Sequence, residues 1–102
     1  MAGLIGAFAS KGQEVGADFN DLTETGIYKI NSDNDAPQPN LPKGAYQFGM
    51  LLVFRMLNDS EDRILQIYVS HNPVVVYVRM RNSFNQNPSW TKWIKLSSTI
   101  LE

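Results

Sequence analysis

The sequence predicts a mainly β domain, an antiparallel meander of about five strands with a short N-terminal helical turn and long polar loops. Three runs rich in β-branched and aromatic residues, 45–57, 63–69 and 74–81, follow one another along the chain. The connectors between them are too short for parallel crossovers, which need a dozen or more residues. At 102 residues with 43% hydrophobic content, the chain suffices for one domain with a single core.

The first 17 residues contain four glycines and no sustained hydrophobic period. They predict a flexible or linker-like lead-in, or a frayed helical piece. The short apolar start has no basic leader and is too brief to span a bilayer, so we expect neither signal peptide nor anchor. The domain is expected over residues 18–98. Residues 99–102 are expected to be a tail, in which Leu101-Glu102 resembles a vector-derived dipeptide.

The early part of the domain predicts a helical turn, a strand and a loop. Capping side chains in Asp18-Phe-Asn-Asp21 favour one short turn of helix, which Gly26 would end. Residues 27–30 alternate and predict a first strand. Residues 31–43 are polar and contain three prolines, so an irregular loop is expected there.

The third run has two unlike faces. One face is wholly apolar, and the other is apolar at one end and cationic at the other. Such a strand is expected to be buried on one side and, on the other, covered only in part, by another element or another chain. A polar loop over 82–88 then leads to a closing strand near 93–96. The apolar face carries Val74, Val76, Val78 and Met80, and the second face carries Val75, Tyr77, Arg79 and Arg81.

Composition argues against several classes of function. A net charge of −1 gives no whole-domain attraction for phosphate backbones, so nucleic acid is not an expected partner. Cysteine is absent, which excludes a disulfide framework and a thiolate nucleophile. His71 is the only histidine, and it is expected to be exposed in a turn, so neither a multi-histidine metal site nor a Ser-His pair is predicted. No cofactor is expected.

Two further site patterns carry little weight. Asn31, Asp33 and Asp35 alternate like the ligands of a calcium loop, but Ala36 replaces the turn glycine and Pro42 the bidentate glutamate. A solvated turn is the better interpretation. A glycosidase would need a carboxylate pair. The candidate carboxylates are expected to lie in loops and termini, and they are Glu14, Asp21, Glu24, Asp59, Glu61 and Asp62.

The most informative constellation is aromatic and cationic. Flat aromatic faces beside guanidinium groups can stack on and hydrogen-bond to sugars or phosphorylated polymers. The same tryptophans could instead anchor the core, and the arginines could pair with carboxylates or belong to a subunit interface, where arginine and tyrosine are enriched. The candidate ligand-binding residues are Tyr77, Arg79, Arg81, Trp90 and Trp93.

Six short motifs follow one another in register along the chain. They are Gly26-Ile-Tyr28, Asp35-Ala-Pro37, Gly49-Met-Leu-Leu-Val53, Gln66-Ile-Tyr68, Val76-Tyr-Val-Arg79 and Trp90-Thr-Lys-Trp93. No single motif is specific, but together they resemble the pyocin-knob-like domains of bacteriophage and prophage tail fibres, and the likeness runs from about Asn20 to Leu96. Two departures are the proline-rich loop over 31–43 and the asparagine- and glutamine-rich loop over 82–88.

The resemblance implies a non-enzymatic module of a virion tail, assembled in the bacterial cytoplasm. Its expected partners are a host cell-surface glycan or protein and the other chains of a homotrimeric fibre, with no insertion into a membrane. Two rival hypotheses remain. The domain could be a purely structural spacer or trimerisation knob, with the face of Arg79 and Arg81 packed on neighbouring chains. It could also be a polysaccharide-trimming enzyme that uses a carboxylate pair.

Overall fold

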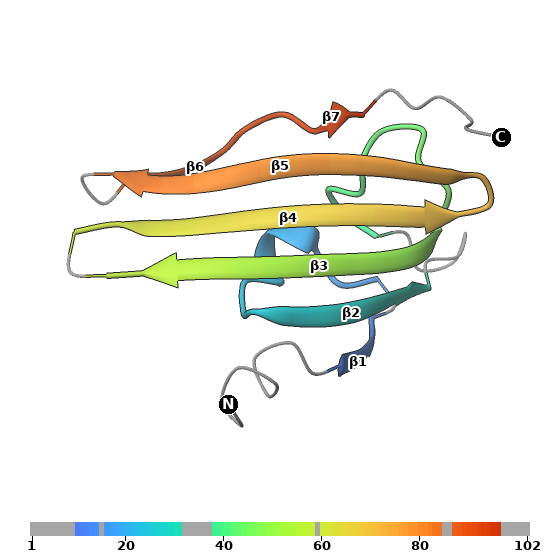
Figure 1. Ribbon diagram of the computed structural model, residues 1–102, viewed down its shortest axis with the longest axis horizontal. Helices are drawn as coiled ribbons and strands as arrows, with labels where there is room; N and C mark the ends of the chain where they lie inside the picture. Colours follow the sequence, from blue (N-terminus) through green and yellow to red (C-terminus); the bar gives the residue numbers. More distant parts are fainter. Residues whose placement is uncertain (1–9, 15, 32–37, 59, 85–86, 97–102) are drawn as a thin grey trace, which may run out of the picture.

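Three long strands form the centre of the computed structural model, which describes residues 10–14, 16–31, 38–58, 60–84 and 87–96. They are β3 (Phe48–Leu57), β4 (Asp62–His71) and β5 (Val74–Phe84), and each pairs antiparallel with the next. β2 (Gly26–Asn31) pairs antiparallel with β3, so β2 to β5 lie side by side in chain order (Figure 1). The predicted mainly β meander is confirmed.

Shorter elements extend the sheet at both edges. β1 (Ser10–Glu14) pairs parallel with β2. β6 (Asn87–Trp90) and β7 (Ile94–Lys95) both pair antiparallel with β5, at different positions along it. The predicted helical turn is η1 (Phe19–Asp21), a single 3-10 turn whose N-cap is Asp18. The chain therefore adds two strands to the meander at the β5 edge and one at the β2 edge.

Two local predictions were wrong. Residues 82–84 continue β5 and residues 87–90 form β6, where a polar loop over 82–88 was expected. Ser10–Glu14 forms a strand where a lead-in or a frayed helical piece was expected. Both segments are polar, and strand pairing at a sheet edge is made by backbone groups that need no apolar side chain. Hydrophobic patterning therefore gave no signal for either strand.

One face of the sheet, which we call the covered face, carries the core. Phe19 and Leu22 lie over it from the η1 region, and the 38–47 segment is joined to the same layer by a hydrogen bond from Phe19 N to Pro39 O. Tyr68, at 0% exposure, donates its hydroxyl to Tyr46 O at 2.6 Å, and burial raises its pKa to about 12. The buried apolar side chains are Phe19, Leu22, Tyr28, Ile30, Leu51, Val53, Ile64, Tyr68 and Tyr77.

The covered face also requires one glycine. Gly49 of β3 lies opposite Ser70 of β4, and a Cβ atom added to it would stand 2.2 Å from the carbonyl oxygen of Val69. No side chain fits at that distance without moving the β4 backbone. Glycine at this position therefore permits the close approach of β3 and β4.

The opposite face, which we call the open face, is apolar yet incompletely buried. Strand register places Ile27, Leu52, Ile67, Val78 and Ile94 in one row across the sheet. The cluster of buried core residues and the hydrophobic residues packed on it are drawn from the covered side, not from this row. Four other side chains of the open face are 40% exposed or more, namely Met50, Met56, Val74 and Met80.

In the third predicted run, the covered face is the one that mixes apolar and cationic side chains, and the wholly apolar face is left open. The wholly apolar face of β5 is the open one, with Val74 66% exposed. The face that mixes apolar and cationic residues is the covered one, with Tyr77 7% and Arg79 5% exposed. The covering comes from η1, the 38–47 segment and residues 90–96. Which face of β5 is buried therefore depends on which segments lie over it, and not on the hydrophobicity of that face.

Candidate functional site

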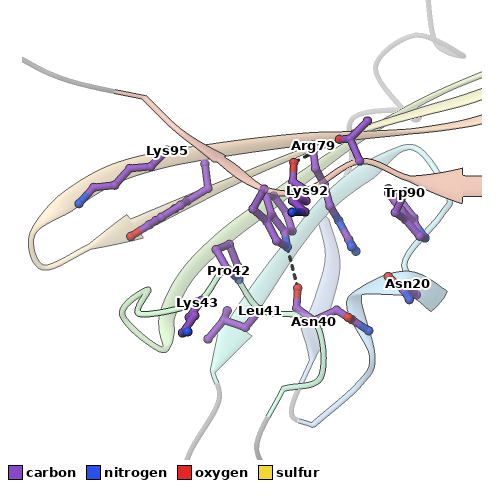
Figure 2. A pocket seen from close by; sticks show the side chains of 12 residues that line it. Asn20, Asn40, Leu41, Pro42, Lys43, Arg79, Trp90, Lys92 and Lys95 are labelled. Carbon is purple, nitrogen blue, oxygen red and sulfur yellow. Dashed lines mark hydrogen bonds between the residues drawn. The ribbon is translucent and has the colours of Figure 1, made fainter.

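A pocket of about 540 Å³ opens on the covered side of β5 (Figure 2). β5 forms its wall, residues 90–95 and 40–43 form its two sides, and η1 contributes the remaining edge. Figure 2 shows Lys43 and Lys95 toward one end and Trp90 and Asn20 toward the other. The described lining residues are Asn20, Asn40, Leu41, Pro42, Lys43, Tyr77, Arg79, Trp90, Thr91, Lys92, Trp93 and Lys95.

The guanidinium group of Arg79 is clamped between two tryptophan rings at this pocket. Its Cζ atom lies 3.9 Å from the centroid of the Trp90 ring and 4.6 Å from that of the Trp93 ring. Both distances are within the range of a cation–π contact, which is strongest when the pair is shielded from water. Arg79 therefore holds both tryptophans in place, and each presents one ring face to the guanidinium.

Gln66 of β4 fixes the orientation of Arg79. Arg79 lies directly opposite Gln66 in the ladder, and its Nε donates to Gln66 Oε1 at 2.8 Å. The Gln66 amide nitrogen donates to Phe19 O at 2.7 Å and to Leu22 O at 2.9 Å. A fully buried glutamine can satisfy all of these groups because its amide both donates and accepts. The η1 turn, β4 and β5 are thereby joined in one network.

Trp93 is positioned by the 38–47 segment as well as by Arg79. Its indole Nε1 donates to Asn40 O at 2.9 Å, the contact drawn as a dashed line in Figure 2. Asn40 has a positive φ of 64°, a left-handed conformation that asparagine tolerates better than most residues. The Trp93 ring also meets Phe19 edge to face at 6.1 Å. Trp93 is therefore part framework and part pocket wall.

Two buried polar atoms at the pocket have no hydrogen-bond partner among the described residues. They are Nη2 of Arg79, which is a donor, and Oδ1 of Asn20, which is an acceptor. Buried polar groups are normally paired, because leaving one unpaired costs about 1–3 kcal/mol. Both residues line one pocket, so an unpaired donor and an unpaired acceptor lie beside the same hollow, and this favours a polar ligand there.

The charge of the pocket is positive. Arg79 and three lysines line it, and no aspartate or glutamate is among its described lining residues. Burial lowers the pKa of Arg79 to about 10, and the nearby charge of Asp18 opposes that shift. The guanidinium therefore stays protonated at neutral pH. The lysines, at positions 43, 92 and 95, are exposed and stand at the rim.

Arg81 lies outside this pocket and is held by an ion-pair cluster. Asp62 accepts hydrogen bonds from Arg55 through both carboxylate oxygens and from Arg81 through one, each at 2.9 Å. The hydrogen bonds and charge of Arg55, followed by the charge of Arg81, hold the pKa of Asp62 below its ordinary value of 3.8. The cluster joins β3, β4 and β5 at the end of the covered face.

The structure brings four of the five candidate residues together. Tyr77, Arg79, Trp90 and Trp93 all line the pocket, although Tyr77 and Arg79 are almost fully buried. Arg81 is not among the lining residues, but its Cζ lies 5.8 Å from the Trp90 ring.

Sequence reasoning missed the polar residues of the opposite wall. Asn20 and Asn40 come from segments that only the fold brings next to β5. Lys92 lies inside the Trp90–Trp93 motif and could have been included from the sequence. The alternating residues of the calcium-like pattern at 33 and 35 lie outside the described residues.

Comparison of the chain with protein-family models, curated proteins and solved structures gives no match. The resemblance to pyocin-knob-like domains therefore stays a prediction. Within the described part of the chain, no group of three or more histidine or acidic side chains is arranged to hold a metal ion. The same residues contain no helix long and apolar enough to cross a membrane.

Proposed function

We propose that this domain is a non-enzymatic binding module that holds an anionic saccharide in the pocket beside Arg79. In the setting implied by the resemblance, it attaches a phage or prophage tail fibre to a glycan of the bacterial surface. The observation that carries the proposal is the buried guanidinium of Arg79, stacked between two tryptophans with one nitrogen unpaired at the pocket.

The presence of one unpaired donor and one unpaired acceptor at the pocket favours a sugar hydroxyl as the bound group. A hydroxyl donates one hydrogen bond and accepts others, so it matches both a donor such as Arg79 Nη2 and an acceptor such as Asn20 Oδ1. The partly exposed tryptophans add flat apolar surface on which the C–H face of a sugar ring can lie. These are two of the contacts by which proteins bind neutral parts of a glycan.

The surrounding charge favours an acidic substituent on that saccharide. Three rim lysines and Arg79 produce a positive potential that the described lining does not offset. Carboxylate or phosphate groups of a bacterial surface polymer match this potential, and charge complementarity raises the rate of association as well as selectivity. Neutral glycans of the same length are expected to bind more weakly.

The decisive experiment is an NMR titration that follows the two tryptophan indole signals and the backbone amides. We expect saturable shifts at Trp90, Trp93 and Asn40 with a uronic-acid oligosaccharide or with phosphate-bearing cell-wall polymers, and smaller shifts with a neutral oligosaccharide. Raising the salt concentration should weaken the acidic ligand selectively. Absence of shifts at the pocket with every acidic and neutral saccharide in a broad bacterial panel would contradict the proposal.

Matched lysine variants identify the site independently of the signal assignment. Lys92→Ala should weaken the acidic ligand roughly threefold to fivefold, because it removes one rim charge worth up to about 1 kcal/mol. Lys29→Ala removes an equally exposed lysine that does not line the pocket, and affinity should not change. Equal effects of the two substitutions would indicate attraction by overall charge and would argue against this pocket.

A further inference from the structure

The open face raises a question that the pocket does not answer, namely what covers an apolar sheet surface. One row of apolar side chains crosses the sheet from β2 to β7 and contains Ile27, Leu52, Ile67, Val78 and Ile94. A second row beside it contains Met50, Val69 and Val76, and a third contains Leu65 and Met80. The apolar rows therefore span the four strands β2 to β5, with β7 added in the first row, and several residues along each.

The size of this face is near the limit for a surface left in water. Four strands about 4.8 Å apart, with about seven residues each at about 3.3 Å, give roughly 400 Å² in flat projection. Soluble monomers rarely expose contiguous apolar patches larger than a few hundred Å². Two such faces in contact bury roughly 800 Å² in projection and more once side-chain relief is counted, close to the ~1,000 Å² of a specific interface.

We infer that the open face is where copies of this chain associate, open face against open face. Two apolar sheets can pack about 10 Å apart with their side chains interdigitated, as the two halves of a β-sandwich do. The same surface serves both partners when two copies are related by a two-fold axis, so no additional surface is required. The inference is independent of the saccharide proposal, because it concerns the other side of the sheet.

The distribution of polar groups on this face fits an interface with a dry centre and a polar rim. Lys29, on β2, stands at one side of the apolar rows, beside Met50 in the register. Arg63 stands at one end, where it pairs with Glu61 at 2.6 Å. His71 stands at the other end, opposite Val74. Depletion of charge at the centre with charge retained at the edge is typical of protein interfaces.

Several side chains of the open face can adapt to a second copy. Three methionines, Met50, Met56 and Met80, are 40% to 49% exposed on this face. Methionine is flexible and polarisable, and it fills irregular gaps at binding surfaces. A hollow of about 570 Å³ beside Met50 and Val74 offers space for such a side chain from the facing copy. Association would leave the pocket of each copy accessible on the outer side.

Measurement of mass in solution tests the inference. The chain has a mass of 11.5 kDa, and light scattering or sedimentation of the wild type should give a multiple of it that falls on dilution. The double variant Met50→Lys/Met80→Lys should be monomeric, with its dissociation constant raised at least roughly 100-fold, because it places charges in the dry centre. Both positions are partly exposed, so the monomer can keep its fold, which circular dichroism would verify.

The matched control lies on the same strand and on the opposite face. Leu57→Lys adds a charge at a side chain that is 67% exposed on the covered side of β3, and it should leave the mass of the oligomer unchanged. A wild type that remains monomeric at millimolar concentration would overturn the inference. So would an oligomer that survives Met50→Lys/Met80→Lys, or a monomer that instead binds lipid vesicles. A monomer that associates only after deletion of residues 1–9 would show that those residues cover the face, and this would also overturn the inference.

Discussion

On the covered face of the sheet, Gln66 and Arg79 are at most 5% exposed, whereas on the open face Met50 is 49% and Val74 66% exposed. On β5, the face with the more polar side chains is therefore the more deeply buried one. The polar pair is buried because Arg79 Nε and the Gln66 amide find defined hydrogen-bond partners in each other and in the carbonyl groups of Phe19 and Leu22, while two tryptophan rings contact the guanidinium. The comparison teaches that burial in this domain depends on which segments cover a face.

The difference also separates two kinds of stabilisation. The covered face combines apolar burial with specific hydrogen bonds, and it therefore fixes the position of η1 and of the 90–96 segment. The open face contributes β propensity and contact between neighbouring strands. In the monomer its apolar side chains obtain only part of the free energy that full burial would give. The same kind of substitution should therefore change the free energy of unfolding by different amounts on the two faces.

The largest difference is expected between two neighbouring leucines of β3. Leu51 is fully buried on the covered face, so Leu51→Ala should lower the free energy of unfolding by about 3 kcal/mol through lost contacts and a cavity. Leu52 points to the open face, and Leu52→Ala should cost under about 1 kcal/mol in the monomer. Urea denaturation at low protein concentration measures both.

Protein concentration sharpens the same comparison. If a second copy covers the open face, the cost of Leu52→Ala should rise with concentration, because association adds stability by mass action. The cost of Leu51→Ala should stay constant. Equal costs for the two substitutions in dilute solution would contradict the assignment of the two faces.

A second prediction reverses the usual relation between hydrophobicity and stability. Gln66→Leu makes the covered face more apolar, yet it should lower the free energy of unfolding by about 2 kcal/mol. The reason is that Arg79 Nε and the carbonyl group of Leu22 lose their partner while buried, and the carbonyl of Phe19 keeps only the bond from Leu22 N. The reverse change, Leu52→Gln on the open face, should cost under about 1 kcal/mol. Thermal unfolding of both variants checks this, and a more stable Gln66→Leu protein would show that the network is dispensable.

The smallest expected effect concerns the ion-pair cluster at the end of the covered face. The pKa of Asp62 is lowered in the folded state, so its contribution is present above about pH 4 and is lost as the pH falls through the folded value. Asp62→Asn should cost about 1 kcal/mol at pH 7, and its stability should depend less on pH between 5 and 2 than that of the wild type.

The more exposed pair of Glu61 and Arg63 serves as the control for this cluster. Arg63→Gln should change stability by less than about 0.5 kcal/mol, because exposed ion pairs contribute little. Urea denaturation across that pH range measures both variants. Parallel pH profiles for the wild type and Asp62→Asn would show that Asp62 carries no such linkage.

Much of the fold was predictable because strand runs are encoded locally. The three long runs, their antiparallel order and the turn before Gly26 follow from β-branched patterning, short connectors and a capping aspartate. β1 and β6 were not predictable, since their pairing is made by backbone groups of polar segments. The tryptophans and Arg79 could be named as candidates from the sequence, but their stacking could not.

The sequence by itself determined the fold class, the alternation of side chains along β5 and the candidate residues of the aromatic and cationic cluster. The tertiary structure alone decided which face of β5 is covered, and it brought Asn20 and Asn40 to the pocket beside Arg79. The physical reason is that alternation sorts side chains between two faces but does not say what lies over either one. That choice depends on where η1, the 38–47 segment and residues 90–96 can satisfy their own polar groups.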